Sequence, residues 1–89
     1  KNIGINILSN KQKKISEYFA NKNNIWGSTK YFLSKKNIPL IINSLVNLSC
    51  KNTKTLSSGD HIIFICKVEE FQINESLKPL IYVNNKYKT

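Results

Sequence analysis

The segment Gly59-Asp60-His61-Ile62-Ile63-Phe64-Ile65 decides the fold that we expect. Turn-forming and polar residues are followed at once by four large apolar residues, a pattern typical of a tight turn that leads into a buried β-strand. The segment also places the only histidine of the chain beside an acid, at the mouth of that strand. Strand ends that face a loop often carry ligand-binding side chains, so His61 is a candidate functional residue.

The residues on either side of this segment predict a β-hairpin. Between Leu45 and Thr55, apolar and polar residues alternate, which predicts a strand with one solvent-exposed face. The apolar face carries Val46, Leu48 and Cys50, and the polar face carries Asn47, Ser49 and Lys51. Residues 56–59 are predicted to form the turn, and the second strand is predicted to run from His61 to about Ile73.

Two features refine this hairpin. The apolar phase slips at Glu69-Glu70, so this pair is a candidate β-bulge, and on a regular strand its two carboxylates would point to opposite faces. Cys50 and Cys66 are expected to be near neighbours on one face. They lack CxxC spacing, and we expect two free thiols without a disulfide.

The rest of the chain alternates short predicted elements with turns. Residues 3–8 are predicted as a strand, and a helix is predicted from Ser9 to about Asn21, with Ser9 and Gln12 as a capping box. Residues 24–37 have no clean period and are predicted as a long, partly ordered loop. Residues 38–42 lead into the hairpin, and residues 79–83 form a last strand after a polar turn. Several short antiparallel strands with one helix suggest a small barrel or part of one.

Length and composition bound the function. The 89 residues form one domain at most, and no apolar run approaches the roughly 20 residues that span a bilayer. Methionine is absent and the chain starts in strand-like sequence, so we expect a piece of a longer chain or a gene product that has lost its front half. The net charge of +9 comes from 14 lysines without arginine, scattered rather than grouped, which favours a solvated surface over a nucleic-acid footprint.

Hydrolytic chemistry has little support. A single histidine allows no justified catalytic triad, the three glycines are isolated, and no metal-ligand spacing is present. We therefore expect no catalytic side chain and no bound metal ion. A bound cofactor would carry any reaction, and the protein would bind and orient it.

Three stretches, taken in order, resemble the flavin reductase-like family, the FMN-binding split-barrel reductases. Residues 6–20, with Asn6-Ile7-Leu8-Ser9, Gln12, Ser16 and Phe19-Ala20, are similar to a family strand and helix. Leu48-Ser49-Cys50, followed by residues 59–65 and Val68, resembles the family's glycine-aspartate-histidine hairpin. Pro79-Leu80-Ile81-Tyr82 with Tyr87 resembles its C-terminal end.

The resemblance implies an antiparallel split β-barrel, here partial because the family's N-terminal strands are missing, with residues 1–89 as the C-terminal portion of one domain. It implies hydride transfer from NADH or NADPH to FMN or FAD in a cytoplasmic homodimer, with a monooxygenase as a partner that receives the reduced flavin. Position by position, the implied flavin and nicotinamide contacts are Asn6, Leu8, Ser9, Gln12, Phe19, His61 and Tyr87. Two positions depart from the family pattern: Tyr18 stands where a basic residue is usual, and Cys66 stands where glycine is usual.

Two alternatives stay open. The chain could be a non-catalytic remnant or dimerisation piece of the same fold, because the family segment that holds the flavin phosphate is missing. It could also be a small basic β-barrel that binds single-stranded nucleic acid through Trp26, Tyr31, Phe32 and nearby lysines. Flavin titration separates the first alternative, and the salt dependence of oligonucleotide binding separates the second.

Overall fold

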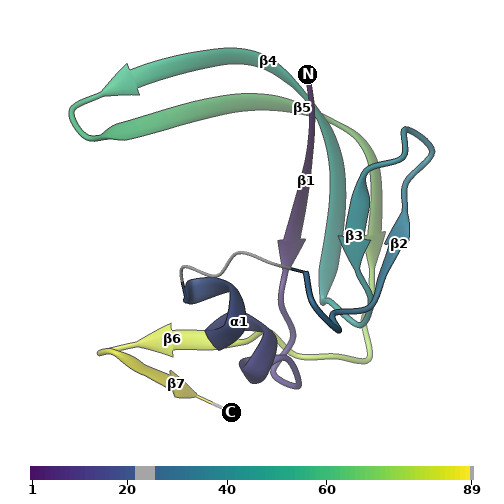
Figure 1. Ribbon diagram of the computed structural model, residues 1–89, viewed down its shortest axis with the longest axis vertical. Helices are drawn as coiled ribbons and strands as arrows, with labels where there is room; N and C mark the ends of the chain where they lie inside the picture. Colours follow the sequence, from purple (N-terminus) through teal and green to yellow (C-terminus); the bar gives the residue numbers. More distant parts are fainter. Residues whose placement is uncertain (22–25, 89) are drawn as a thin grey trace.

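The computed structural model describes residues 1–21 and 26–88, which form an open, C-shaped arrangement of antiparallel sheets and a helix (Figure 1). In chain order the elements are β1 (Asn2–Ile7), α1 (Lys13–Ala20), β2 (Tyr31–Leu33), β3 (Pro39–Ile41), β4 (Val46–Ser58), β5 (His61–Ile73), β6 (Ile81–Val83) and β7 (Lys86–Lys88). They make one three-stranded sheet, ordered β1-β4-β5, and two hairpins, β2-β3 and β6-β7. The prediction of a mainly β fold with one helix is confirmed. Within the described residues the sheets do not close into a barrel.

The predicted hairpin forms the long arm of the molecule. Ser58 pairs with His61, and the turn between them is Gly59-Asp60, where Gly59 has a φ of 60° that favours glycine. The second strand has the predicted bounds, His61 to Ile73. The first strand runs further than expected, to Ser58, because residues 56–58 pair with residues 61–63 instead of turning.

Two bulges shape this hairpin. Ser49 pairs with Glu70 and Cys50 pairs with Val68, so Glu69 is the extra residue and the predicted bulge at Glu69-Glu70 is confirmed. A second irregularity leaves Thr53 unpaired opposite Ile65, and the Thr53 hydroxyl donates to the Ile65 carbonyl at 2.9 Å. Bulges bend a strand and increase its twist. They account for the curve of β4 and β5 at the top of Figure 1.

The prediction that one face of β4 is wet is wrong for the half of the strand nearest β1. Asn47 and Ser49 are only 3% and 2% exposed. The cover comes from the β2-β3 hairpin, which lies over this part of the sheet and was predicted as part of a loop (Figure 1). Of that predicted loop, residues 24 and 25 lie outside the described residues, and residues 31–33 form β2.

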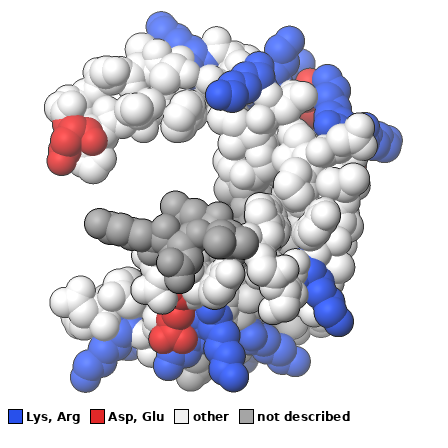
Figure 2. Space-filling model, viewed as in Figure 1, with Lys and Arg blue, Asp and Glu red and all other residues white. Residues whose placement is uncertain are grey.

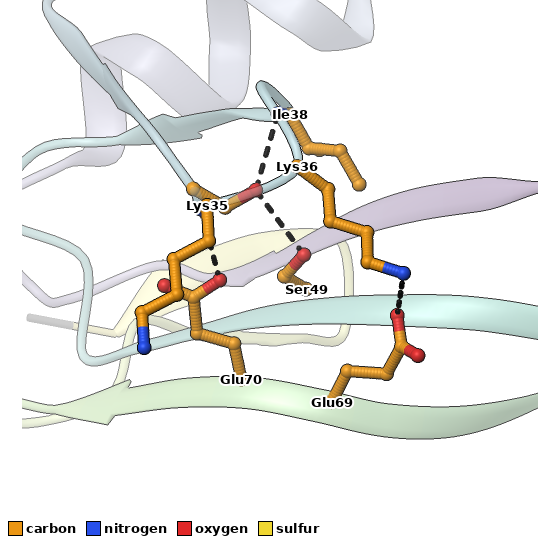
Figure 3. Close-up of polar contacts among 7 residues, drawn as sticks. Lys35, Lys36, Ile38, Ser49, Glu69 and Glu70 are labelled. Atoms are coloured by element: carbon orange, nitrogen blue, oxygen red, sulfur yellow. Dashed lines mark hydrogen bonds and ion pairs between the residues drawn. The ribbon is translucent and has the colours of Figure 1, made fainter.

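The turn between β2 and β3 is fastened to the bulge, as Figure 3 shows. The Lys35 backbone N–H donates to Glu70 Oε2 at 3.1 Å, and Lys36 Nζ lies 3.6 Å from Glu69 Oε1. Both carboxylates therefore reach the same turn. The expectation that they point to opposite faces is wrong, because the bulge removes the regular alternation of the strand at this point.

The same turn is closed from inside by Ser34. Its hydroxyl oxygen accepts from the Ile38 backbone N–H at 3.1 Å, and the Ser49 hydroxyl lies 3.3 Å away (Figure 3). Asn37 has a φ of 61°, a left-handed conformation that asparagine tolerates well. The β2-β3 hairpin is thus positioned by polar side chains as much as by apolar packing.

The two cysteines lie two residue pairs apart along the β4-β5 ladder. Cys50 pairs with Val68, whereas Cys66 pairs with Asn52, and both thiols are free. Burial, chiefly, and then the nearby Cys66 thiol and Glu69 carboxylate raise the pKa of the Cys50 thiol. A raised pKa reduces the thiolate fraction, so Cys50 has the character of a small buried apolar residue.

Helix α1 is shorter than predicted. It begins at Lys13 instead of Ser9, because Ser9 is tied to other parts of the chain: it bridges to Pro79, and its hydroxyl donates to the Asn43 carbonyl. Half of the predicted capping box exists, since Gln12 Oε1 accepts from the Ser9 backbone N–H at 2.9 Å. Among the described residues no helix is long and apolar enough to cross a bilayer.

Gly4 gives a direct test of how β1 packs against β3. A Cβ atom on Gly4 would lie 2.8 Å from Ile38 Cγ2 and 3.1 Å from Leu40 Cδ2. We expect Gly4→Ala to destabilise the protein by about 1–3 kcal/mol, the usual cost of overpacking, measured by urea unfolding. Gly59→Ala is the control: no atom would lie within 4 Å, so only the left-handed backbone contributes, about 1–2 kcal/mol. A Gly4→Ala variant as stable as the parent would contradict this packing.

Candidate functional site

At the end of β1, the half-buried Asn6 side chain meets the buried Asn47 side chain of β4. Asn6 Oδ1 accepts from the Ile41 backbone N–H at 3.0 Å and from Asn47 Nδ2 at 2.8 Å, and Asn47 Nδ2 also donates to the Ile41 carbonyl at 2.9 Å. These three bonds tie β1, β3 and β4 together at one point. The predicted ligand residue Asn6 therefore has its carbonyl oxygen engaged inside the protein.

Ser9 and Gln12 fasten the following turn in the same way. Both are buried, at 0% and 4% exposure. Gln12 Nε2 donates to the Ile42 carbonyl at 2.8 Å, and the Ser9 hydroxyl donates to the Asn43 carbonyl at 3.0 Å. The two side chains hold the backbone of residues 42 and 43 against the start of α1. Ser9 and Gln12 therefore set the position of this backbone segment.

Leu8 joins this region to the C-terminal segment. The Leu80 backbone N–H donates to the Leu8 carbonyl at 3.0 Å, and the Asn10 N–H donates to the Lys78 carbonyl at 2.8 Å. The first and third sequence motifs are therefore neighbours in space, although about 70 residues separate Leu8 from Leu80 in the chain. This juxtaposition could not be read from either motif alone.

Phe19 belongs to a row of aromatic rings. Its ring centroid is 5.6 Å from that of Tyr18 and 5.5 Å from that of Trp26, and Trp26 is 5.4 Å from Tyr31. Edge-to-face contacts of this kind add a modest stabilisation beyond apolar burial. Trp26 and Tyr31, which the nucleic-acid alternative needs as stacking platforms, are thus packed in part against other rings.

Tyr87 lies on the other side of α1. Its hydroxyl is 2.8 Å from the Ser16 hydroxyl, its ring is 4.8 Å from that of Tyr82, and Lys13 Nζ lies 5.7 Å from its centroid. Between α1 and the β6-β7 hairpin there is an open groove of about 660 Å³. It is lined by Lys13, Glu17, Ala20, Asn21, Tyr82, Asn85, Lys86 and Tyr87.

His61 stands apart from the other predicted residues. It lies at the tip of the β4-β5 arm, far along the hairpin from the region of α1 (Figure 1). Its side chain is 82% exposed, and its nearest charged group is Asp60, with 3.4 Å between Nε2 and Oδ1. The structure brings together Asn6, Leu8, Ser9, Gln12, Phe19 and Tyr87 near α1, and within one chain it does not bring His61 to them.

The residues around α1 offer binding groups and no reactive set. In the described ranges no three histidine, cysteine or acidic side chains gather as a metal site would require. The available chemistry is hydrogen bonding, ring contact and positive charge from lysine. Such a site binds and orients a molecule that carries its own reactivity.

Sequence reasoning missed several residues of this region. Asn47 was assigned to a wet face, and Lys13, Tyr82 and Lys86 were not singled out. A signal for the groove existed in Asn84-Asn85: a two-residue turn there pairs Tyr82 with Tyr87, and both asparagines indeed have positive φ, 53° and 61°. That pairing sets the two tyrosine rings on one face of the hairpin.

Comparison with known proteins identifies the class. The family described as Flavin reductase like domain matches residues 1–89, so the chain belongs to this family. An NADH-dependent flavin reductase from a Rhodococcus species is 26% identical over 86 residues, covering 97% of this chain and 48% of the relative. FMN reductase (NADH) RutF from Acinetobacter baylyi is also 26% identical, covering 93% of this chain and 46% of that protein.

Solved structures agree on the fold. The flavin reductase PheA2 in its native state superposes with a TM-score of 0.88 at 31% identity, covering 99% of this chain and 56% of that one. The chain thus spans about half the length of the curated relatives it matches. The family assignment confirms the resemblance found in the three motifs, including the partial coverage of the domain.

Proposed function

We propose that the chain is the C-terminal portion of an NAD(P)H:flavin oxidoreductase that transfers a hydride from NADH or NADPH to FMN or FAD. The observation that carries this proposal is the family match, which extends over residues 1–89. The names of the two curated relatives support NADH as the donor, and one of them supports FMN as the acceptor. A cytoplasmic location and a monooxygenase that uses the reduced flavin are part of the same proposal.

The residues near α1 would have two different roles toward a flavin: some would contact it, and others would position the backbone beside it. Leu8 and Phe19 are half-buried and would contact the ring system, and Tyr87 would line its edge. Asn6, Ser9 and Gln12 already have partners inside the protein, so they would position the backbone of residues 41–43 instead of touching the ligand. When bound, the flavin supplies the hydride acceptor, and the protein supplies alignment.

His61 would contribute from the arm. Its imidazole is accessible, and an N–H of the ring would donate to the nicotinamide carboxamide of the hydride donor. Because the tip of the arm lies away from α1 in one chain, this role requires either a second copy of the molecule or movement of the arm (Figure 1). The first requirement agrees with the proposal of a homodimer.

The arm itself supports association. Ile62 and Phe64 are 62% and 55% exposed, and Ile63 and Ile65, which alternate with them along the strand, are each 46% exposed. Both faces of the hairpin are therefore apolar, whereas an antiparallel hairpin in water usually has one polar face. Apolar surface on both faces indicates that each is covered in the working assembly.

Phe64→Glu tests the proposed homodimer. A buried carboxylate at an interface is costly to desolvate, so we expect the dimer dissociation constant to rise by about tenfold or more, measured by analytical ultracentrifugation of the full-length protein. Lys67→Glu on the same strand is the control, because it introduces the same carboxylate at a position that is already charged and exposed. Dissociation constants that are unchanged in both variants would show that this face is not the interface.

One observation favours the alternative that the chain is a non-catalytic scaffold that binds no flavin. Asn6 Oδ1, the Ser9 hydroxyl and both amide atoms of Gln12 have hydrogen-bond partners inside the protein without any ligand. Titration of the full-length protein with FMN, followed by quenching of flavin fluorescence, separates the two functions. Saturable binding supports the reductase, and a folded protein that leaves the fluorescence unchanged supports the scaffold.

Nucleic-acid binding receives no comparable support. On the face drawn in Figure 2, lysine side chains lie scattered along the outer rim of the C and do not gather into one patch. A binding groove for a single strand combines continuous positive charge with free aromatic faces. Figure 2 shows no such continuous charge among the described residues on this face.

A further inference from the structure

The groove between α1 and the β6-β7 hairpin has no role in the proposed contacts apart from Tyr87. It holds about 660 Å³, whereas four other hollows in the described part of the chain hold about 50 to 280 Å³. It is open to solvent, and its walls come from two segments that lie side by side in Figure 1. A hollow of this size accommodates a ligand as large as a nucleotide.

One wall of the groove is a fixed aromatic surface. Tyr87 is held at its hydroxyl by Ser16, 2.8 Å away, and its ring stands against that of Tyr82 at an angle of 62°. Tyr82 is itself 60% exposed. An exposed ring whose neighbour is fixed offers a planar ligand a stacking face at low entropic cost.

The charge in the groove favours an anion. Lys13 and Lys86 line it, against the single carboxylate of Glu17. Two ammonium groups suit a phosphate, because each is a compact charge with rotatable donors. The isoalloxazine ring and the dihydronicotinamide ring of NADH are both uncharged, so the two lysines point to the phosphate-bearing part of a nucleotide.

We propose that this groove binds the adenosine diphosphate part of a dinucleotide, with the adenine stacked on Tyr82 and the phosphates between Lys13 and Lys86. NADH and FAD share this part, and FMN lacks it. The assignment to either source rests on the proposed function, whereas the binding of a nucleoside diphosphate rests on the groove alone.

The test is equilibrium binding of ADP to the full-length protein by titration calorimetry. We expect saturable binding that weakens with added salt, since charge interactions at an exposed site are screened. Tyr82→Ala should weaken ADP binding by about tenfold, the scale of one base-stacking contact, and Lys86→Ala by about three- to tenfold. Lys88→Ala is the matched control on the same strand, outside the groove.

The source is identified with the same variants. If the groove serves the donor, Tyr82→Ala raises the KM for NADH and leaves FAD affinity unchanged; if it serves the acceptor, FAD affinity falls instead. Either pattern supports the groove. Absence of ADP binding, or equal ADP affinity in the parent and Tyr82→Ala proteins at equal thermal stability, would overturn it.

These outcomes separate the groove from the proposed function. If the protein reduces FMN but does not bind ADP, the proposed ADP site is wrong and the proposed reductase function stands. If the protein binds ADP through Tyr82 and Lys86 but never reduces a flavin, the proposed ADP site stands and the proposed reductase function is wrong.

Discussion

Replacement of Asn47 by leucine is expected to destabilise the protein by about 2–4 kcal/mol. Leucine has nearly the shape of asparagine but donates no hydrogen bond, so Asn6 Oδ1 and the Ile41 carbonyl would each lose a partner. Loss of the Asn47 donor to the Ile41 carbonyl costs about 1–3 kcal/mol, and Asn6 Oδ1, which keeps the Ile41 N–H as a partner, loses one hydrogen bond worth about 0.5–1.5 kcal/mol. Because domains of this size are stable by only about 5–15 kcal/mol, the loss would be a large fraction of the total.

The measurement is the free energy of unfolding from a urea titration of the full-length protein. Asn2→Leu is the matched control: it makes the same substitution on β1, at an exposed position, and should change the free energy by less than about 0.5 kcal/mol. Hydrogen exchange at the Ile41 amide adds a local readout, since this N–H donates to Asn6. Equal stability of the two variants would show that the amide pair does not hold β3 in place.

Asn47 also shows what the sequence could and could not predict. The strand was predicted correctly from alternation, yet the wet face was wrong because alternation does not reveal what covers a face. The cover, β2-β3, is made of three-residue strands that are too short for a periodic signal. Two cues were present: the apolar run Tyr31-Phe32-Leu33, and Asn37 two residues before Pro39, which together are typical of a tight turn between two strands.

The bulge at Glu69-Glu70 could be predicted, because a one-residue slip in the apolar phase has a single simple cause. The bulge at Thr53 could not, because residues 52–58 on β4 are mainly polar and show no phase to slip. For the candidate site, the motif around residues 6–20 and the C-terminal motif were each recognised. Their contact through Leu8, Leu80, Ser16 and Tyr87 depends on tertiary packing that no local pattern encodes.

Replacement of His61 by alanine is expected to lower kcat/KM for NADH by about 10- to 100-fold without loss of stability. The magnitude is the cost of leaving one polar ligand group without its hydrogen bond, about 1–3 kcal/mol. Stability should be unaffected, because the imidazole is 82% exposed and its one nearby charged partner is Asp60, which is exposed as well. Steady-state kinetics of NADH oxidation with FMN as acceptor give the value.

Two variants control this experiment. Ser58→Ala changes the residue paired with His61 at the same tip and should leave kcat/KM within about twofold of the parent value. His61→Asn keeps a hydrogen-bond donor at a similar position and should recover part of the lost activity. If His61→Ala matches the parent enzyme, the arm has no part in the reaction and the role given to His61 is wrong.

The most direct test of the central claim is hydride transfer itself. The full-length protein is mixed with FMN and NADH without oxygen, and NADH absorbance and flavin absorbance are followed together. The account predicts that both fall in step, mole for mole, and faster than in a mixture without protein. A folded protein that neither binds FMN nor accelerates the loss of NADH would contradict it.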